Sequence, residues 1–249
     1  MQEAYIYDAV RTPRGRGRKD GALYGIKSVG LLSTVLDAIR DRNHLDTQLV
    51  EDIIIGCVTQ VGEQSGDVAK SAAIKSGYSD AVAGVTLNRF CGSGLESINQ
   101  SAAYIMSGQM DLLIAGGVES MTRNPMGSDG FGLLGDPEMT STHRIVPQGI
   151  SADLIATLDG VGRSEVDAFA AESHRRAAAA QAQGWFGRSV VPVLDVAGMV
   201  ALDRDETIRK ETSTEGLSVL KPSFAIMGEK GGYDTVAMQR YPEVERIAQ

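Results

Sequence analysis

The first half of the chain alternates between short apolar runs and longer segments in which apolar residues recur at helical spacing. The strand-like runs are residues 4–10, 52–58, 82–87 and 112–115. The helical segments between them are residues 28–41, 66–76 and 95–106. Pro13 lacks the backbone N–H that a sheet ladder needs, so the first run is expected to end before it. Alternation of this kind predicts an α/β fold, with a sheet covered by helices on both faces.

Cys91 lies where one of these runs ends and the next helical segment begins. At a helix start, free backbone N–H groups and the positive end of the helix dipole favour a thiolate, and Gly92 and Gly94 leave room for a substrate. The position predicts a nucleophile for covalent catalysis. The competing interpretation is a small buried hydrophobe, which is the usual fate of a free cysteine and the role expected of Cys57.

The second half of the chain differs from the first in composition and in the periodicity of its apolar residues. Residues 122–149 are rich in Gly, Pro, Met, Ser and Asp without sustained periodicity, which predicts a long irregular segment that covers a site. Residues 151–158 and 165–183 read as helices, the second of them ending at Gly184. Residues 190–194 read as an edge strand because Pro192 interrupts them.

Composition excludes several classes of function. Two cysteines in 249 residues argue against a disulfide framework, and neither a signal peptide nor an apolar run of ~18 residues appears, so we expect a cytoplasmic protein without a membrane span. The net charge of -8 disfavours nucleic acid as a partner. The three histidines, His44, His143 and His174, have no metal-ligand spacing, and none is a good candidate for a base beside Cys91.

Three motifs, in order and at their observed separations, resemble those of the thiolases, the family of acetyl-CoA C-acetyltransferases and 3-ketoacyl-CoA thiolases. They read DAVRTP at residues 8–13, with a glycine at Gly15, NRFCGSGLE at residues 88–96, and AGGVESM at residues 115–121. The similarity extends along nearly the whole chain, which corresponds to about the first two-thirds of a thiolase subunit.

The resemblance implies a thiolase fold, in which two related α/β halves stack in layers. This chain would supply the first α/β half, layered helix-sheet-helix, together with an inserted loop domain, and the second half would be missing from it. Residues 1–121 would form the N-terminal domain that carries the nucleophile. Residues 122–249 would form the CoA-binding loop domain and a C-terminal extension, whose residues 236–247 would add a helix or an oligomer contact.

The resemblance also implies a reaction. The acyl group of an acyl-CoA would move to Cys91, and free CoA or a second acyl-CoA would remove it, which gives thiolysis of a 3-oxoacyl-CoA or a Claisen condensation. No cofactor would be bound permanently, because coenzyme A and acyl-CoA are substrates. Arg209 and Phe224 match an arginine and an aromatic residue that seat the CoA nucleotide, whereas Pro147 and Gln148 replace a His-Met pair that touches the pantetheine arm. A solvated arginine and a core phenylalanine are the alternatives for the first two.

The second half of a thiolase holds an Asn-containing turn, a histidine that activates the nucleophile and a second cysteine that moves the α-proton. None of these segments occurs by residue 249, so the resemblance implies a split enzyme that is inactive alone. Its partners would be an acyl-CoA substrate, a second chain with the C-terminal half, and further copies in a dimer or tetramer. The alternatives are a nicked or truncated thiolase, a non-catalytic CoA-binding relative, and a condensing enzyme of the β-ketoacyl synthase type. The motif at residues 115–121 favours a thiolase over the last, and acylation of Cys91 would separate an enzyme from a binding protein.

Overall fold

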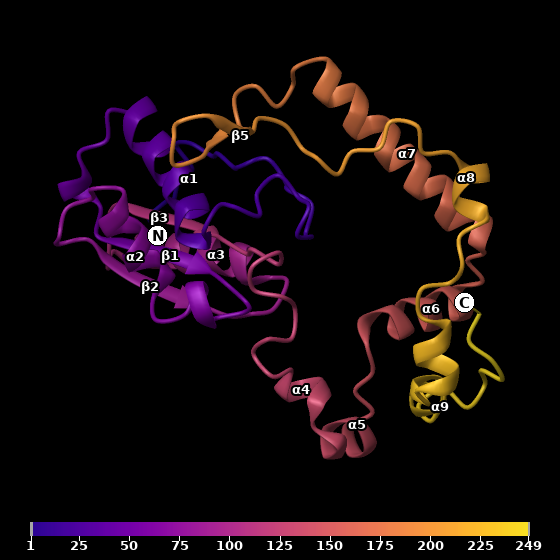
Figure 1. Ribbon diagram of the computed structural model, residues 1–249. Coiled ribbons are helices and arrows are strands. Elements are labelled where there is room, and N and C mark those ends of the chain that lie inside the picture. Colours follow the sequence, from indigo (N-terminus) through magenta and orange to yellow (C-terminus); the bar gives the residue numbers. More distant parts are fainter. Residues whose placement is uncertain (1, 249) are drawn as a thin grey trace. The chain divides into compact units, whose positions relative to one another are not determined.

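The computed structural model of the protein describes residues 2–248, apart from the side chain of Leu134 (Figure 1). The chain forms two compact units. The first unit contains the chain up to Asp129 together with Gly184–Thr207, and the second contains Gly130–Gln183 together with the chain from Ile208 onward. The functional division expected between residues 121 and 122 stays a prediction.

A parallel sheet forms the centre of the first unit. Its strands run in the order β2 (Ala83–Leu87), β1 (Asp52–Gly56), β3 (Leu113–Gly117). Asp52 pairs with both Ala83 and Leu113, and the register continues to Gly56, so the carboxyl ends of all three strands meet at one edge. The side chains of Ile53, Ile54 and Ile55 in β1 are all buried, although they point alternately to the two faces of the sheet. Because both faces are covered, the strand has a continuous apolar run and no alternation of apolar and polar residues.

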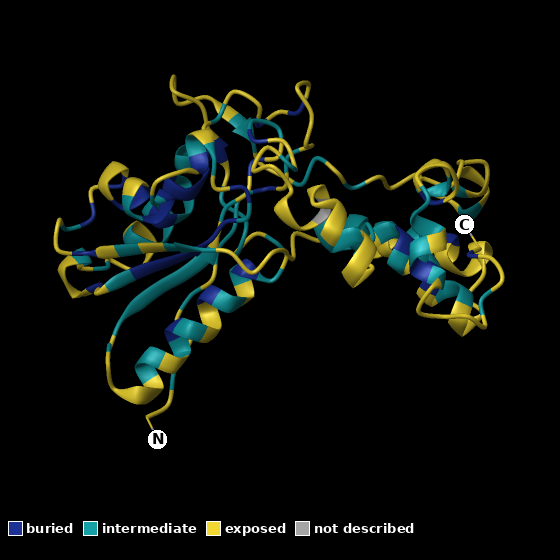
Figure 2. Ribbon diagram, turned by 90° about the horizontal axis from the view of Figure 1, so that it is seen from below, coloured by how far each residue is buried: buried dark blue, intermediate teal, exposed yellow. Residues whose placement is uncertain are grey.

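Helices cover both faces of this sheet: α1 (Ser28–Arg42), α2 (Val68–Lys75) and α3 (Ser93–Ser107). Leu32 and Leu36 of α1 share one core with α2 and with the alternate β1 side chains Ile53 and Ile55. Ile54 points to the other face. On that face α3 packs against β1 and β3, and Figure 2 shows buried residues in the strands and in the helices beside them. The predicted helix-sheet-helix layering is therefore confirmed.

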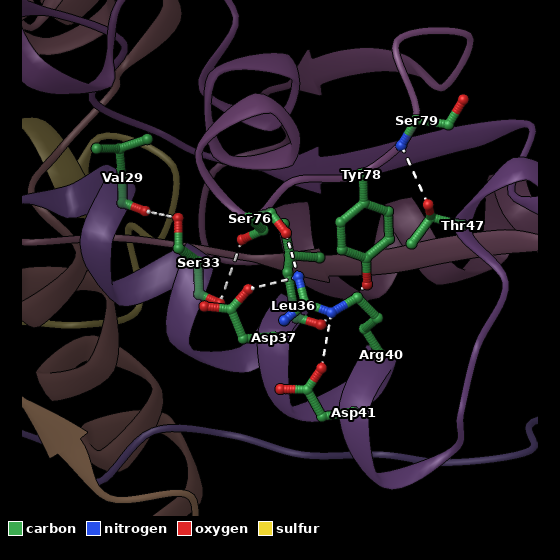
Figure 3. A network of polar contacts seen from close by, with 10 residues as sticks. All are labelled: Val29, Ser33, Leu36, Asp37, Arg40, Asp41, Thr47, Ser76, Tyr78 and Ser79. Atoms are coloured by element: carbon green, nitrogen blue, oxygen red, sulfur yellow. Dashed lines mark hydrogen bonds and ion pairs between the residues drawn. The ribbon is translucent and has the colours of Figure 1, made fainter.

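Polar contacts fix α1 against the loop that follows α2 (Figure 3). The guanidinium of Arg40 donates to the carbonyl oxygen of Ser76 and forms an ion pair with Asp41 at 2.7 Å. The hydroxyl of Tyr78 donates to the carbonyl oxygen of Leu36 at 2.9 Å, and burial raises the pKa of Tyr78 to about 12. Single-turn 3₁₀ helices, η1 (Thr47–Leu49) and η2 (Gly62–Gln64), lie in the connections around β1.

The strand predicted at residues 4–10 is wrong. This segment is extended but belongs to no sheet of the described chain, and Tyr5, Ile6 and Tyr7 are 64%, 78% and 86% exposed. An extended segment becomes a strand only when a neighbour takes up its backbone hydrogen bonds. The bridge nearest to it joins Arg11, just past its end, to Val190.

The returning segment Gly184–Thr207 is tied to the N-terminal loop by carboxylates. Arg11 donates to both oxygens of Asp205, at 2.6 and 2.8 Å, and this pairing lowers the pKa of Asp205. Glu206 accepts from the backbone N–H of Arg16 at 2.8 Å. Within the segment, β4 (Val193–Leu194) and β5 (Val200–Leu202) form a short antiparallel pair, so the strand predicted at residues 190–194 begins only after Pro192.

The second unit is built from helices. In chain order they are α4 (Gly132–Gly135), α5 (Pro137–His143), α6 (Gln148–Asp159), α7 (Arg163–Ala182), α8 (Thr214–Ser218), the π-helix η3 (Ile226–Lys230) and α9 (Tyr233–Met238). Its core joins Ile150 and Leu154 of α6 to Ala237 of α9 and to Ile247 near the C-terminus. The helix expected over residues 236–247 is therefore wrong for most of that range, because α9 ends at Met238 and residues 239–248 are not helical. These residues instead pack within their own unit through Ile247.

Candidate active site

Cys91 lies in the turn that joins β2 to α3, and its side chain is exposed. Gly92 precedes the first residue of α3, Ser93, so the thiol stands directly before the N-terminus of a helix of 15 residues. The first N–H groups of a helix have no partner within it, and they carry the positive end of its dipole. The placement predicted from the sequence is confirmed, while the role of Cys91 stays a prediction.

Side chains on both sides of Cys91 close the turn. Asn88 Oδ1 accepts from the backbone N–H of Phe90 at 2.8 Å, and Phe90 has a left-handed φ of 47°. The hydroxyl of Ser93 accepts from the N–H of Arg89 at 2.8 Å and donates to the carbonyl oxygen of Phe90 at 2.6 Å. The nucleophile candidate is therefore held in a defined turn.

Glycines let the N-terminus of α3 touch the strand ends. A Cβ atom on Gly56, the last residue of β1, would lie 2.3 Å from the carbonyl carbon of Ser93 and 2.6 Å from the amide nitrogen of Gly94. The hydroxyl of Ser97 donates to the carbonyl oxygen of Gly116 in β3 at 2.8 Å. This close approach brings Cys91 to the carboxyl edge of the sheet, where ligands bind in many α/β proteins.

Glu119, just beyond β3, holds the loop that follows β1. Its Oε2 accepts from the backbone N–H groups of Val58 and Thr59 at 2.8 and 3.4 Å. The carbonyl oxygen of Val58 in turn accepts from Asn88 Nδ2 at 3.1 Å. The loops after all three strands are thereby connected.

Gln64 extends this connection to the start of α1. It is 1% exposed, its Nε2 donates to Glu119 Oε1 at 2.7 Å, and its Oε1 accepts from Ser28 Oγ at 3.0 Å and from the N–H of Ser120 at 2.8 Å. Every polar group of the Gln64 side chain is thus engaged. The sequence alone gives neither Gln64 nor Glu119 a role, because the partners that connect them to the strand ends and to α1 lie 36 to 61 residues away.

The second cysteine has the opposite environment. Cys57 is buried in the main core beside Val68 and Ile55. Burial, and then the charge of Glu119, raises the pKa of Cys57 to about 12. A thiol that stays protonated is a poor nucleophile, so the expectation that Cys57 only packs agrees with its surroundings.

Two of the predicted CoA-binding residues lie near one another in the second unit. Gln148 is exposed at the first position of α6, and the ring of Phe224 lies where a Cβ on Gly149 would be, 2.1 Å from the nearest ring atom. Phe224 also packs on the core of Ile150, so its ring is half-buried. The structure thus supports a packing role for Phe224 whether or not it meets CoA.

Arg209 lies at the surface of the second unit, beside α7. Its backbone N–H donates to Nδ1 of His174 at 3.2 Å. Among residues 2–248, no hydrogen bond or ion pair engages its guanidinium, which leaves the fork of donors available to an anion. The described residues hold no cluster of three His, Cys, Asp or Glu suited to a metal ion. Over the same range, every helix is too short or too polar to be a membrane span.

Comparison with known proteins places these features in a family context. The profile described as thiolase, N-terminal domain, matches residues 4–232.

The beta-ketoadipyl-CoA thiolase of Pseudomonas putida is 38% identical over 241 residues, which cover 89% of this chain and 60% of that protein. The 3-ketoacyl-CoA thiolase of Shewanella sp. (strain MR-7) is 37% identical over 230 residues, covering 90% and 58%. The beta-ketoadipyl-CoA thiolase of Escherichia coli is 37% identical over 248 residues, covering 92% and 61%. The chain spans about three fifths of the length of these relatives.

Proposed function

Because the chain belongs to the thiolase family, we propose that it is the nucleophile-bearing part of an acyl-CoA acyltransferase. The observation that carries this proposal is the exposed thiol of Cys91, held in a closed turn directly before the N-terminus of α3. The names of the relatives, beta-ketoadipyl-CoA thiolase and 3-ketoacyl-CoA thiolase, support a 3-oxoacyl-CoA as the substrate class. We place this reaction in fatty acid metabolism as part of the proposal.

The proposed chemistry is nucleophilic catalysis by the Cys91 sulfur. In thiolysis the thiolate attacks C3 of a 3-oxoacyl-CoA, the C2–C3 bond breaks, and C2 takes a proton as acetyl-CoA leaves. The acyl group then remains on Cys91 as a thioester until a CoA thiolate attacks it and the cysteine sulfur leaves. Condensation is the reverse sequence.

The second unit would bind the CoA moiety. The guanidinium of Arg209 has no partner among the described residues and suits a phosphate. Gln148 and Phe224 lie at one end of α6, where they would contact the pantetheine arm or the adenine. A local cation is needed because the chain carries a net charge of -8. Coenzyme A is a substrate in this scheme, with no permanently bound cofactor.

A second polypeptide would supply the groups that the proposed reaction still needs. The nucleophile requires a base, and condensation requires a group that moves the α-proton. In the described chain, Cys57 is buried and so is not available to Cys91 for these roles. None of the three histidines has a sequence position that marks it as the base. We infer a cytoplasmic enzyme in which this chain pairs with one that carries the C-terminal thiolase half, in a dimer or tetramer of such pairs.

A thiolysis assay tests this proposal. Loss of a 3-oxoacyl-CoA in the presence of CoA is measured with the purified chain alone, with an added C-terminal thiolase half, and with the Cys91→Ala variant plus that half. We expect activity only in the second mixture. Full activity of the chain alone would overturn the two-chain assignment, and activity of Cys91→Ala would overturn the nucleophile assignment.

A non-catalytic CoA-binding protein is the second candidate, since it would use the same Arg209 surface. It predicts that acyl-CoA binds to the paired chains while no 3-oxoacyl-CoA is consumed. Binding measured beside the thiolysis assay therefore separates the two functions.

A further inference from the structure

A path of hydrogen bonds links the turn of Cys91 to the end of β3. Glu119 Oε2 accepts from the N–H of Val58 at 2.8 Å, and the carbonyl oxygen of Val58 accepts from Asn88 Nδ2 at 3.1 Å. Asn88 Oδ1 accepts from the N–H of Phe90 at 2.8 Å, and Phe90 is the residue before Cys91. Glu119 and Asn88 contribute side chains to this path, whereas Val58 and Phe90 contribute only backbone groups.

The turn needs such support because Phe90 has a left-handed backbone, with a φ of 47°. A non-glycine residue in this region persists only where the surrounding contacts hold it. Asn88 uses its acceptor for Phe90 and its donor for Val58, so both ends of its amide are fixed. The amide therefore sets the position of Phe90 relative to the loop after β1.

The chemistry at position 119 calls for a carboxylate. Its three partners, the N–H groups of Val58 and Thr59 and the Nε2 of Gln64, are all donors. A glutamine at this position would turn its own N–H₂ group toward one of these donors. A bond between a carboxylate and N–H groups is also stronger than one between neutral groups.

We propose that Glu119 and Asn88 are positioning residues for Cys91. Glu119 fixes the loop after β1, that loop orients Asn88, and Asn88 holds Phe90 so that the thiol is presented at the N-terminus of α3. The inference deepens the proposed function, on which it rests for the role of Cys91. Neither residue touches the sulfur in the described contacts, so both act through the turn.

Alkylation of the full chain by iodoacetamide tests the proposal without any enzymatic partner. The Cys91 sulfur displaces iodide, a C–S bond replaces the C–I bond, and the thiol proton goes to solvent. Peptide mass spectrometry follows the labelling of Cys91, while the buried Cys57 reports any general opening of the fold. The variants are Asn88→Ala, Asn88→Asp, which keeps the acceptor and loses the donor, and Glu119→Gln. The matched control is Asn99→Asp, because Asn99 is exposed on α3.

Asn88→Ala should slow the labelling of Cys91 by about two- to five-fold, which is the range expected when a reactive thiolate loses its alignment with the helix N-terminus that stabilises it. Asn88→Asp and Glu119→Gln should give smaller decreases, and Asn99→Asp none. Cys57 labelling should not change in the Asn88 and Asn99 variants, which leave the charge of Glu119 beside Cys57 in place. Equal Cys91 rates in Asn88→Ala and Asn99→Asp would overturn the proposal. A change in Cys91 that appears only together with faster labelling of Cys57 would also overturn it, because it would report unfolding.

The complete enzyme gives a second readout. With the C-terminal half present, Asn88→Asp should lower kcat while KM for CoA stays the same, and an unchanged kcat would contradict the proposal. If the unmodified enzyme transfers no acyl group but the Asn88 variants still slow alkylation, the proposed function fails and the positioning role stands.

Discussion

The two cysteines show how strongly a residue's surroundings decide its chemistry. Cys57 lies in the main core, where burial raises its pKa to about 12, whereas Cys91 is exposed in a turn before a helix. The sequence places Cys57 in an apolar run, and the structure places it directly after β1. The position of Cys91 between a strand and a helix is also visible in the sequence. The hydrogen bonds that close the Cys91 turn are visible only in the fold.

Burial of Cys57 predicts a loss of stability in alkaline solution. Its pKa is raised from 9.0 to about 12 in the folded protein, so stability is complete below about pH 9 and falls as the pH rises toward 12. Between about pH 8 and 10.5 the free energy of unfolding should fall by roughly 2 kcal/mol more in the unmodified chain than in Cys57→Ala. Urea unfolding at the two pH values measures this difference. Equal decreases in both proteins would contradict the assignment.

Arg209 is predicted to contribute to CoA binding. A charge-assisted hydrogen bond is worth about 1.5 to 3 kcal/mol, so Arg209→Ala should weaken CoA binding by about one to two decades without unfolding the protein. Calorimetric titration of the complete enzyme with CoA gives the dissociation constant. Arg240→Ala is the matched control, because Arg240 is an exposed arginine of the same unit. A dissociation constant that does not change in Arg209→Ala would reject the role.

At the scale of elements, local sequence pattern predicted most of the first unit. Each α-helix and strand from α1 to β3 lies within two residues of its predicted bounds, because apolar periodicity is a local feature. The two 3₁₀ helices in this part of the chain, η1 and η2, were not predicted. The strand predicted at residues 4–10 did not form, since pairing is not local and the segment finds no neighbouring strand among the described residues. Pro192 likewise shortened β4 to two residues.

The candidate site could be predicted only in part for the same reason. Cys91 and the glycines after it could be recognised because they form one contiguous motif. Asn88 belongs to a residue type that is common in turns. Glu119 and Gln64 were missed because their partners come from loops far apart in sequence. Whether Arg209, Phe224 and Gln148 contact CoA stays a prediction.

The packing of α3 on the strand ends gives a prediction for stability. Gly56→Ala would place a Cβ atom 2.3 Å from the backbone of Ser93, so the start of α3 must move away from the sheet. We expect a loss of about 1–3 kcal/mol in the free energy of unfolding, as for other overpacked sites. Gly94→Ala is the control, since a Cβ there meets open space and alanine favours a helix. Equal stability of the two variants in urea unfolding would contradict the close approach.

At the scale of the whole molecule, the chain joins an α/β unit that carries Cys91 to a helical unit that carries Arg209, Phe224 and Gln148. The N-terminal thiolase domain profile matches residues 4–232, so α9 and the residues after it lie beyond the match. These residues nevertheless complete the core of the second unit through Ala237 and Ile247. The chain spans about three fifths of the length of its curated relatives.

Direct detection of the acyl-enzyme tests the central claim most directly. The chain, paired with its C-terminal half, is incubated with an acyl-CoA, quenched in acid and digested, and the acylated peptide is identified by mass spectrometry. The account predicts one acyl group on Cys91, none on Cys57, and release of the label when free CoA is added before quenching. An acyl group on Cys57 with none on Cys91, or no covalent adduct while acyl-CoA binds, would contradict it.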